Sequence, residues 1–158
     1  MATLTATRAA AGFPAFKNSS GAGALSVAYG SYDVATNPTI ADVLEICRLP
    51  AGAVVLGGWL RMEDLDTNAA ETIDVDVGFL TNGVEATDAD AFGNFGVRTG
   101  DAVTDYLPEG GVLLPLHGTL KDGPVALTKE TVVTVTFVAA AATFAAGTIT
   151  VQVWYVNP

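Results

Sequence analysis

The chain has 158 residues, 15% of them charged and half of them apolar, with 17 acidic against 7 basic side chains and a formal net charge of −10. The apolar share excludes a disordered tail, and the negative charge argues against nucleic acid or an anionic membrane as a partner, because both are bound through cationic contacts. One domain is expected at this length, and the single cysteine, Cys47, cannot form a disulfide within the chain.

Residues 1–23 are predicted to form an extended N-terminal arm, followed by a single domain over residues 24–158. The arm is rich in small residues, has no acidic side chain, and carries the cations Arg8 and Lys17 and the aromatic rings Phe13 and Phe16. A segment of this composition cannot build a core alone, so it is either disordered or laid along a neighbouring molecule. We expect these four side chains to contact a subunit or partner that offers acidic surface.

In the domain, apolar and polar residues alternate in a way that predicts β-strands along most of its length. Val75 and Val77, for example, are expected to point inward and Asp74 and Asp76 outward, since a shift of one residue would bury the carboxylates. Strands are predicted near residues 25–29, 40–49, 54–63, 72–79, 112–120, 125–127, 131–138 and 148–156. About eight short strands without a helix of ten residues predict an all-β fold, an antiparallel two-sheet sandwich of the jelly-roll type.

The segment 81–111 lacks this alternation and is expected to be a long loop with one helical turn at 88–92. It lies in the most acidic part of the chain, residues 63–109, where twelve acidic residues are opposed by Arg98 alone. Long loops of this kind are often functional or contact-forming. Asp88, Asp90, Phe92 and Arg98 are therefore predicted to contact another subunit or a partner molecule.

The two tryptophans, Trp59 and Trp154, fall on the faces of their strands opposite the apparent core residues. Three environments fit them. They form a sugar-stacking platform, they lie in a subunit interface, where aromatic residues are enriched, or they belong to the core with the inward and outward assignments exchanged.

The residues that common catalytic mechanisms require are mostly missing. His117 is the only histidine, which excludes a metal site built from several histidines, and no serine lies in a nucleophile motif. A dyad of Cys47 and His117 would form only if the fold brought them together. The simpler interpretation is a buried cysteine and a histidine on a strand face. We expect no enzyme and no cofactor.

A cluster of aspartates offers calcium the oxygen ligands that hard cations prefer. Its members are Asp64, Asp66, Asp74, Asp76, Asp88 and Asp90. Their spacing matches no known calcium loop, and acidic residues on a strand face and in loops are more often simply solvated. No metal site is therefore predicted.

Several short motifs follow one another in the domain. They are Leu49-Pro50-Ala51-Gly52-Ala53 at the end of a strand, Gly58-Trp59-Leu60 in the next, and the loop Asp64-Leu65-Asp66-Thr67. The strand 73–79, the segment 88–92 and an alanine-rich turn ending in Gly147 come after them. Over residues 24–156 this order resembles small structural proteins of tailed bacteriophages that decorate or cement the capsid.

The resemblance implies a non-enzymatic virion protein, made in the host cytoplasm and placed on the outer surface of the capsid. It implies a jelly-roll subunit, a homotrimer, that bridges neighbouring major capsid proteins and stabilises the shell. The mean hydropathy of +0.41 agrees, since it indicates that part of the surface is buried against other subunits. The alternative is a carbohydrate-binding β-sandwich module that uses Trp59 and Trp154, with calcium as an optional ligand.

Overall fold

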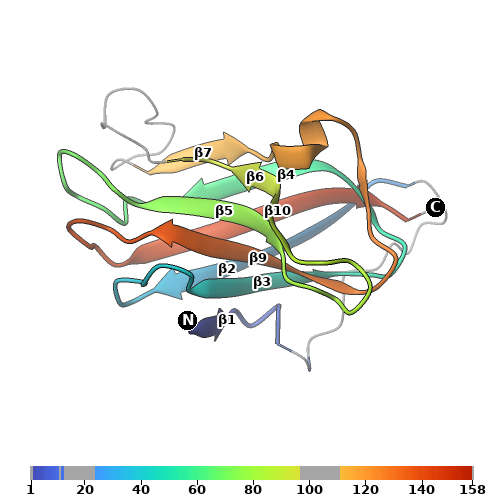
Figure 1. Cartoon of the computed structure of the whole chain (residues 1–158), viewed down its shortest axis with the longest axis horizontal. Helices are drawn as coiled ribbons and strands as arrows, with labels where there is room; N and C mark the ends of the chain where they lie inside the picture. The colour runs from blue at the N-terminus through green and yellow to red at the C-terminus, as the bar shows by residue number, and fades with distance from the viewer. Residues whose placement is uncertain (1, 11, 13–23, 97–110, 158) are drawn as a thin grey trace.

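The computed structural model describes residues 2–10, 12, 24–96 and 111–157, and within them the chain folds into two β-sheets packed face to face (Figure 1). Sheet A has the strand order β1 (Thr3–Thr5), β3 (Val43–Leu49), β9 (Thr131–Ala139), β5 (Asp74–Phe79) and β6 (Asp88–Asn94). Sheet B has the order β2 (Ser26–Val34), β10 (Gly147–Val156), β4 (Val54–Met62) and β7 (Val112–Pro115), and the short β8 (Val125–Ala126) also pairs with β4.

The connectivity is that of a jelly roll. Setting aside β1 and β8, the remaining eight strands form the two four-stranded orders β2-β10-β4-β7 and β3-β9-β5-β6, and the chain changes sheet at every step except between β5 and β6. All pairings are antiparallel apart from β1 with β3. The predicted all-β two-sheet sandwich is confirmed.

The core lies between the sheets and comes from one side of each strand, as the alternation predicts. Val133, Val135 and Phe137 of β9 and Val151 and Val153 of β10 are completely buried. The intervening side chains of these strands point away from the core. The sandwich therefore has two outer faces, one on each sheet, whose chemistry is free to differ.

Close contact between the sheets depends on Gly30 of β2. A Cβ atom at this position would lie 2.2 Å from the carbonyl oxygen of Ile46 on β3, and a rigid backbone atom cannot move away from it. The glycine therefore allows β2 and β3, which belong to different sheets, to approach closely.

Two segments differ from the sequence-based prediction. Residues 88–92, expected as a helical turn in a loop, belong to strand β6, whose pairing with β5 shifts register between Val77 and Phe79, so that no regular alternation remains. The predicted strand 112–120 ends at Pro115, and Gly118–Lys121 form the 3-10 helix η2. In the described residues, no helix is long and apolar enough to cross a membrane.

Candidate interaction surfaces

The outer side of sheet B forms an aromatic face. We define it by Val27, Tyr29, Trp59, Leu113, Gln152 and Trp154. Gln152 of β10 lies opposite both Tyr29 of β2 and Trp59 of β4, and Trp154 lies opposite Val27. The rings of Trp59 and Trp154 contact each other edge to face, with centroids 6.3 Å apart and an interplanar angle of 76°.

The aromatic face is exposed and contains a shallow hollow. Tyr29 keeps 45% of its surface accessible and Val27 38%. The hollow has a volume of about 330 Å³ and is lined by Trp59, Arg61, Leu113, Thr150 and Gln152. Both tryptophans are therefore on the outside of the sandwich and not in its core. At their interplanar angle of 76°, the two rings do not form one flat surface on which a sugar ring could stack.

The described part of the arm lies against its own chain. β1 pairs with β3, the Ala2 amide donates a hydrogen bond to Asp42 Oδ1 (2.7 Å), and Ala9 is fully buried. The Arg8 guanidinium lies 4.3 Å from the centroid of the Tyr29 ring and donates to its hydroxyl (3.2 Å). Arg8 thus links the arm to the aromatic face. The other predicted arm contacts, Phe13, Phe16 and Lys17, lie outside the described residues.

The outer side of sheet A has a different chemistry, and we call it the acidic face. It comprises Glu45 of β3, Asp74 and Asp76 of β5, and Thr134 and Thr136 of β9. Thr134 lies between Glu45 and Gly78, and Thr136 lies opposite Asp76. Among the residues that the structure describes, four buried side-chain oxygens on this face have no hydrogen-bond partner, namely Asp74 Oδ1, Asp76 Oδ1, Thr134 Oγ1 and Thr136 Oγ1.

The carboxylates of the acidic face and of the adjoining β6 are held in an unfavourable environment. Burial, followed by the charges of Asp74 and Asp90, raises the pKa of Asp76 to about 6. Burial, together with a hydrogen bond and a charge from Asp90, raises the pKa of Asp88. Both shifts show that negative charge is crowded here, since either effect favours the protonated form.

The remaining predicted contact residues are split between surface and core. Asp90 lies on the exposed side of β6, beside η2. Phe92 is fully buried, with its ring 5.8 Å from that of Phe79, because the irregular pairing of β6 turns it into the core. Its side chain is therefore removed from the surface, contrary to its expected place in a contact loop. Arg98 lies outside the described residues.

A second hollow opens on the acidic face next to Thr134. It has a volume of about 330 Å³ and is lined by Glu45, Arg48, Leu80, Thr81, Asn82, Glu130, Val132 and Thr134. Arg48 within it forms an ion pair with Glu130 (2.9 Å), and its Nε donates to the carbonyl of Ala9 (3.0 Å). The sequence pattern placed the threonines of β9 outward, but gave no sign that their hydroxyls would be buried without partners.

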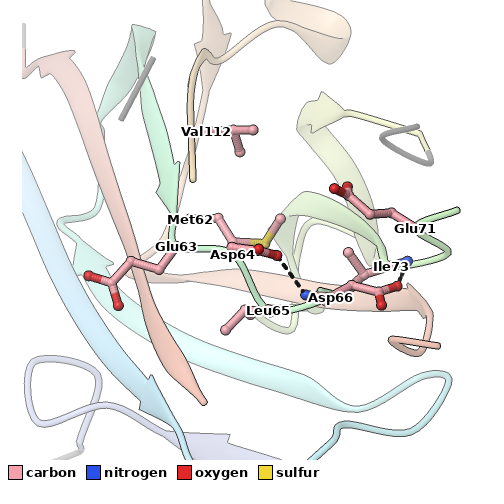
Figure 2. A pocket seen from close by; sticks show the side chains of 8 residues that line it. All are labelled: Met62, Glu63, Asp64, Leu65, Asp66, Glu71, Ile73 and Val112. Atoms are coloured by element: carbon pink, nitrogen blue, oxygen red, sulfur yellow. Dashed lines mark hydrogen bonds between the residues drawn. The ribbon is translucent and has the colours of Figure 1, made fainter. Parts of the chain in front are cut away.

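The loop Asp64–Thr67 has a structural role at one end of the sandwich (Figure 2). Asp66 is almost completely buried, and its carboxylate accepts hydrogen bonds from the amides of Thr72 (2.8 Å), Ala142 (2.9 Å) and Thr143 (2.8 Å). Burial opposes ionisation, but these bonds outweigh it and lower the pKa of Asp66 to about 2. The carboxylate therefore holds two loops together and is occupied by protein donors.

Cys47 and His117, the candidate catalytic residues, both occupy structural positions in the fold. Cys47 is completely buried in β3, and burial raises the pKa of its thiol to about 12, so it remains protonated. His117 caps η2, where its Nδ1 accepts a hydrogen bond from the Gly118 amide (2.6 Å). In the part of the chain that the structure describes, no group of three His, Cys, Asp or Glu side chains is placed to hold a metal ion.

Comparisons with solved structures connect this fold to phage capsids. A chain of the capsid of Ralstonia phage GP4 is 23% identical, with a TM-score of 0.76 and 99% of each chain covered. A chain of the cyanophage Pam1 capsid asymmetric unit is 30% identical, with a TM-score of 0.66 and 94% of each chain covered. A chain of the acidic stable capsid structure of Helicobacter pylori bacteriophage KHP30 is 20% identical, with a TM-score of 0.57, over 87% of this chain and 90% of that one.

No protein-family model and no curated protein matches the sequence. The identity and coverage of the cyanophage match nevertheless show the relationship, and the other two matches share the fold. The chain belongs to a family of phage capsid-associated proteins. The resemblance found in its sequence motifs is confirmed at that level.

Proposed function

We propose that the protein decorates the outside of a phage capsid as a homotrimer and stabilises the shell by bridging neighbouring major capsid proteins. The observation that carries this proposal is the likeness to phage capsid chains over nearly the whole length of the protein. Each trimer would make several weak contacts with the shell at once. Once one contact has formed, the others form at high effective concentration, so the trimer binds more tightly than any single contact.

The aromatic face supports self-association. Exposed apolar surface of this kind usually marks an interaction site, and tryptophan and tyrosine are the residues most often found at the centre of interfaces. The net charge of −10 makes copies of the chain repel one another, so an interface between copies is favoured where apolar contacts dominate. In this proposal Trp59 and Trp154 lie between subunits, and Arg8 orients Tyr29 at the margin.

Co-sedimentation and heating of undecorated capsids test the proposal. Capsids assembled from the major capsid protein of the same phage are mixed with the purified protein, centrifuged, and then melted in a calorimeter. We expect the protein to sediment with the capsids in a saturable amount and to raise their melting temperature. Failure to co-sediment, together with unchanged capsid melting, would overturn the proposal.

A further inference from the structure

The acidic face combines negative charge with oxygens that lack donors. A buried acceptor without a partner destabilises the folded chain, so native proteins contain few of them. Here four occur on two adjacent strands: Asp74 and Asp76 on β5 and Thr134 and Thr136 on β9. Thr134 has no accessible surface in this fold, yet its hydroxyl is unpaired and lines the hollow on the same face.

The chemistry of this surface selects donors that carry positive charge. The oxygens of Asp74 and Asp76 accept hydrogen bonds, and a threonine hydroxyl also has acceptor capacity. The hollow beside them is lined by the acidic residues Glu45 and Glu130 and by the basic residue Arg48. Arg48 already forms an ion pair with Glu130. A lysine or arginine side chain would supply both the missing donors and the missing charge.

The charge of this chain disfavours a second copy as the source of that charge. Of its seven basic residues, Arg48, Arg61 and Lys121 form ion pairs with the chain's own acids, and Lys17 and Arg98 lie outside the described residues. Arg8 is stacked on Tyr29. Two copies, each with a net charge of −10, would also repel each other if their acidic faces met.

We infer that the acidic face docks on the capsid shell, where it binds a lysine- or arginine-bearing segment of the major capsid protein. The inference rests on the proposed decoration of the capsid and specifies the surface used and the chemistry of the partner. The basic side chain enters the hollow beside Thr134, and the neighbouring part of the segment supplies donors to Asp76 and Thr136. The aromatic face on the opposite side of the sandwich remains available for contacts between subunits.

The test compares two double variants of equal charge. D74N/D76N removes two negative charges from the acidic face, and D33N/D122N removes two from elsewhere, since Asp33 lies on β2 and Asp122 follows η2. Binding of each variant to undecorated capsids is measured by co-sedimentation, and the native mass is measured in parallel. We expect D74N/D76N to weaken capsid binding at least tenfold, D33N/D122N to change it less than twofold, and both to keep the wild-type mass.

A third variant separates hydrogen bonding from charge. T134V keeps the size of the side chain and removes the unpaired hydroxyl, so it leaves the fold intact and is expected to weaken capsid binding severalfold without any change in net charge.

The possible outcomes are distinct. Equal losses for the two double variants would mean unspecific electrostatics and would overturn the inference, as would wild-type binding by D74N/D76N. A changed native mass for D74N/D76N would assign the face to contacts between copies and would also overturn it. If the wild-type protein itself fails to bind capsids, the proposed function falls, and this inference falls with it.

Discussion

The two outer faces of the sandwich are built on similar four-stranded frames but present opposite chemistry. On sheet B, the side chains that point away from the core include Tyr29, Trp59 and Trp154, and the rings of the two tryptophans contact each other. On sheet A, the equivalent positions carry Asp76, Thr136 and neighbouring residues whose oxygens lack donors. The first face is suited to an apolar partner and the second to a cationic one.

The acidic face is also unlike the carboxylate site at Asp66. Both sites bury carboxylate oxygens, but Asp66 accepts several backbone hydrogen bonds and has a pKa of about 2, whereas Asp76 has none at Oδ1 and a pKa of about 6. The chain can therefore satisfy a buried carboxylate when it stabilises the fold. Asp66 stabilises the folded subunit, whereas the unpaired oxygen of Asp76 is what we expect on a surface that binds a partner.

The largest expected effect comes from breaking the aromatic face. Replacing both tryptophans, W59S/W154S, should weaken self-association at least tenfold, because aromatic residues at interface centres commonly contribute about 2 kcal/mol or more each. Sedimentation velocity should show the proposed trimer of the wild-type protein replaced by monomer. V84S is the control, since Val84 is an exposed apolar residue outside both faces. Loss of the trimer in V84S, or its survival in W59S/W154S, would contradict the assignment of this face.

A large effect on stability is expected at the satisfied carboxylate. Replacing Asp66 by alanine removes the acceptor for several buried amides and should cost on the order of 3 kcal/mol, a fall in Tm of roughly 6–12 °C. Because the folded-state pKa is lowered to about 2, the stabilisation is present above about pH 4 and disappears as the pH falls toward 2. Thermal melts from pH 7 to pH 2.5 should therefore show the deficit shrinking in acid.

D33A is the control for the Asp66 variant. Asp33 is an exposed carboxylate of β2 that accepts a hydrogen bond from Thr148 Oγ1 (2.9 Å), and its loss should change Tm by no more than about 2 °C. If D66A and D33A lower Tm equally, the buried hydrogen bonds of Asp66 do not stabilise the fold more than an exposed one does. Asp66 would then not be a stabilising carboxylate with which Asp76 can be contrasted.

An intermediate effect is expected when the described part of the arm is deleted. A protein lacking residues 1–10 loses the β1–β3 pairing, the buried Ala9 and the Arg8–Tyr29 contact, which links the two sheets. We expect a loss of about 1–3 kcal/mol and a Tm lower by roughly 2–12 °C, with the sandwich still folded by circular dichroism. An unchanged Tm would show that the arm is not docked on its own subunit.

The regular strands of this fold are predictable from the sequence because their two sides face different surroundings. Much of β5, β9 and β10 alternates between inward and outward side chains, so their inward valines, and with them the two outer faces, follow largely from a period of two residues. β6 was missed because its register against β5 shifts, which removes the period from the sequence. β1 was not predicted because its three residues are too few to show an alternation of apolar and polar side chains.

The candidate sites were predictable only in part. The outward position of Trp59 and Trp154 follows from the alternation, but their mutual contact depends on the pairing of β4 with β10, strands about ninety residues apart in the chain. The unpaired hydroxyl of Thr134 depends on β3 and β5 lying on either side of β9. Properties that arise from neighbours distant in sequence leave no local pattern, and three-dimensional structure is needed to find them.

The smallest effect is expected from Asp76→Asn in the free protein. The folded-state pKa of about 6 lies above the ordinary value of 3.8, so folding disfavours the charged form, and the wild-type protein loses stability as the pH rises from about 4 to 6. The variant lacks this loss. Because the side chain is partly exposed, solvent screening limits the gain to about 1 kcal/mol, or roughly 2–4 °C in Tm, at pH 7.5.

At pH 3 the Asp76→Asn variant and the wild-type protein should melt together, because Asp76 is then mostly protonated in both the folded and the unfolded state. D33N, with the same change of charge on sheet B, should show no such pH-dependent gain. Stabilisation by D76N together with weaker capsid binding would mean that the residue is kept at a cost to the isolated subunit, as expected for a contact made only in the assembled particle. A variant that is less stable at neutral pH would instead place Asp76 among the residues that hold the monomer together, like Asp66, and the distinction between the two carboxylates would fail.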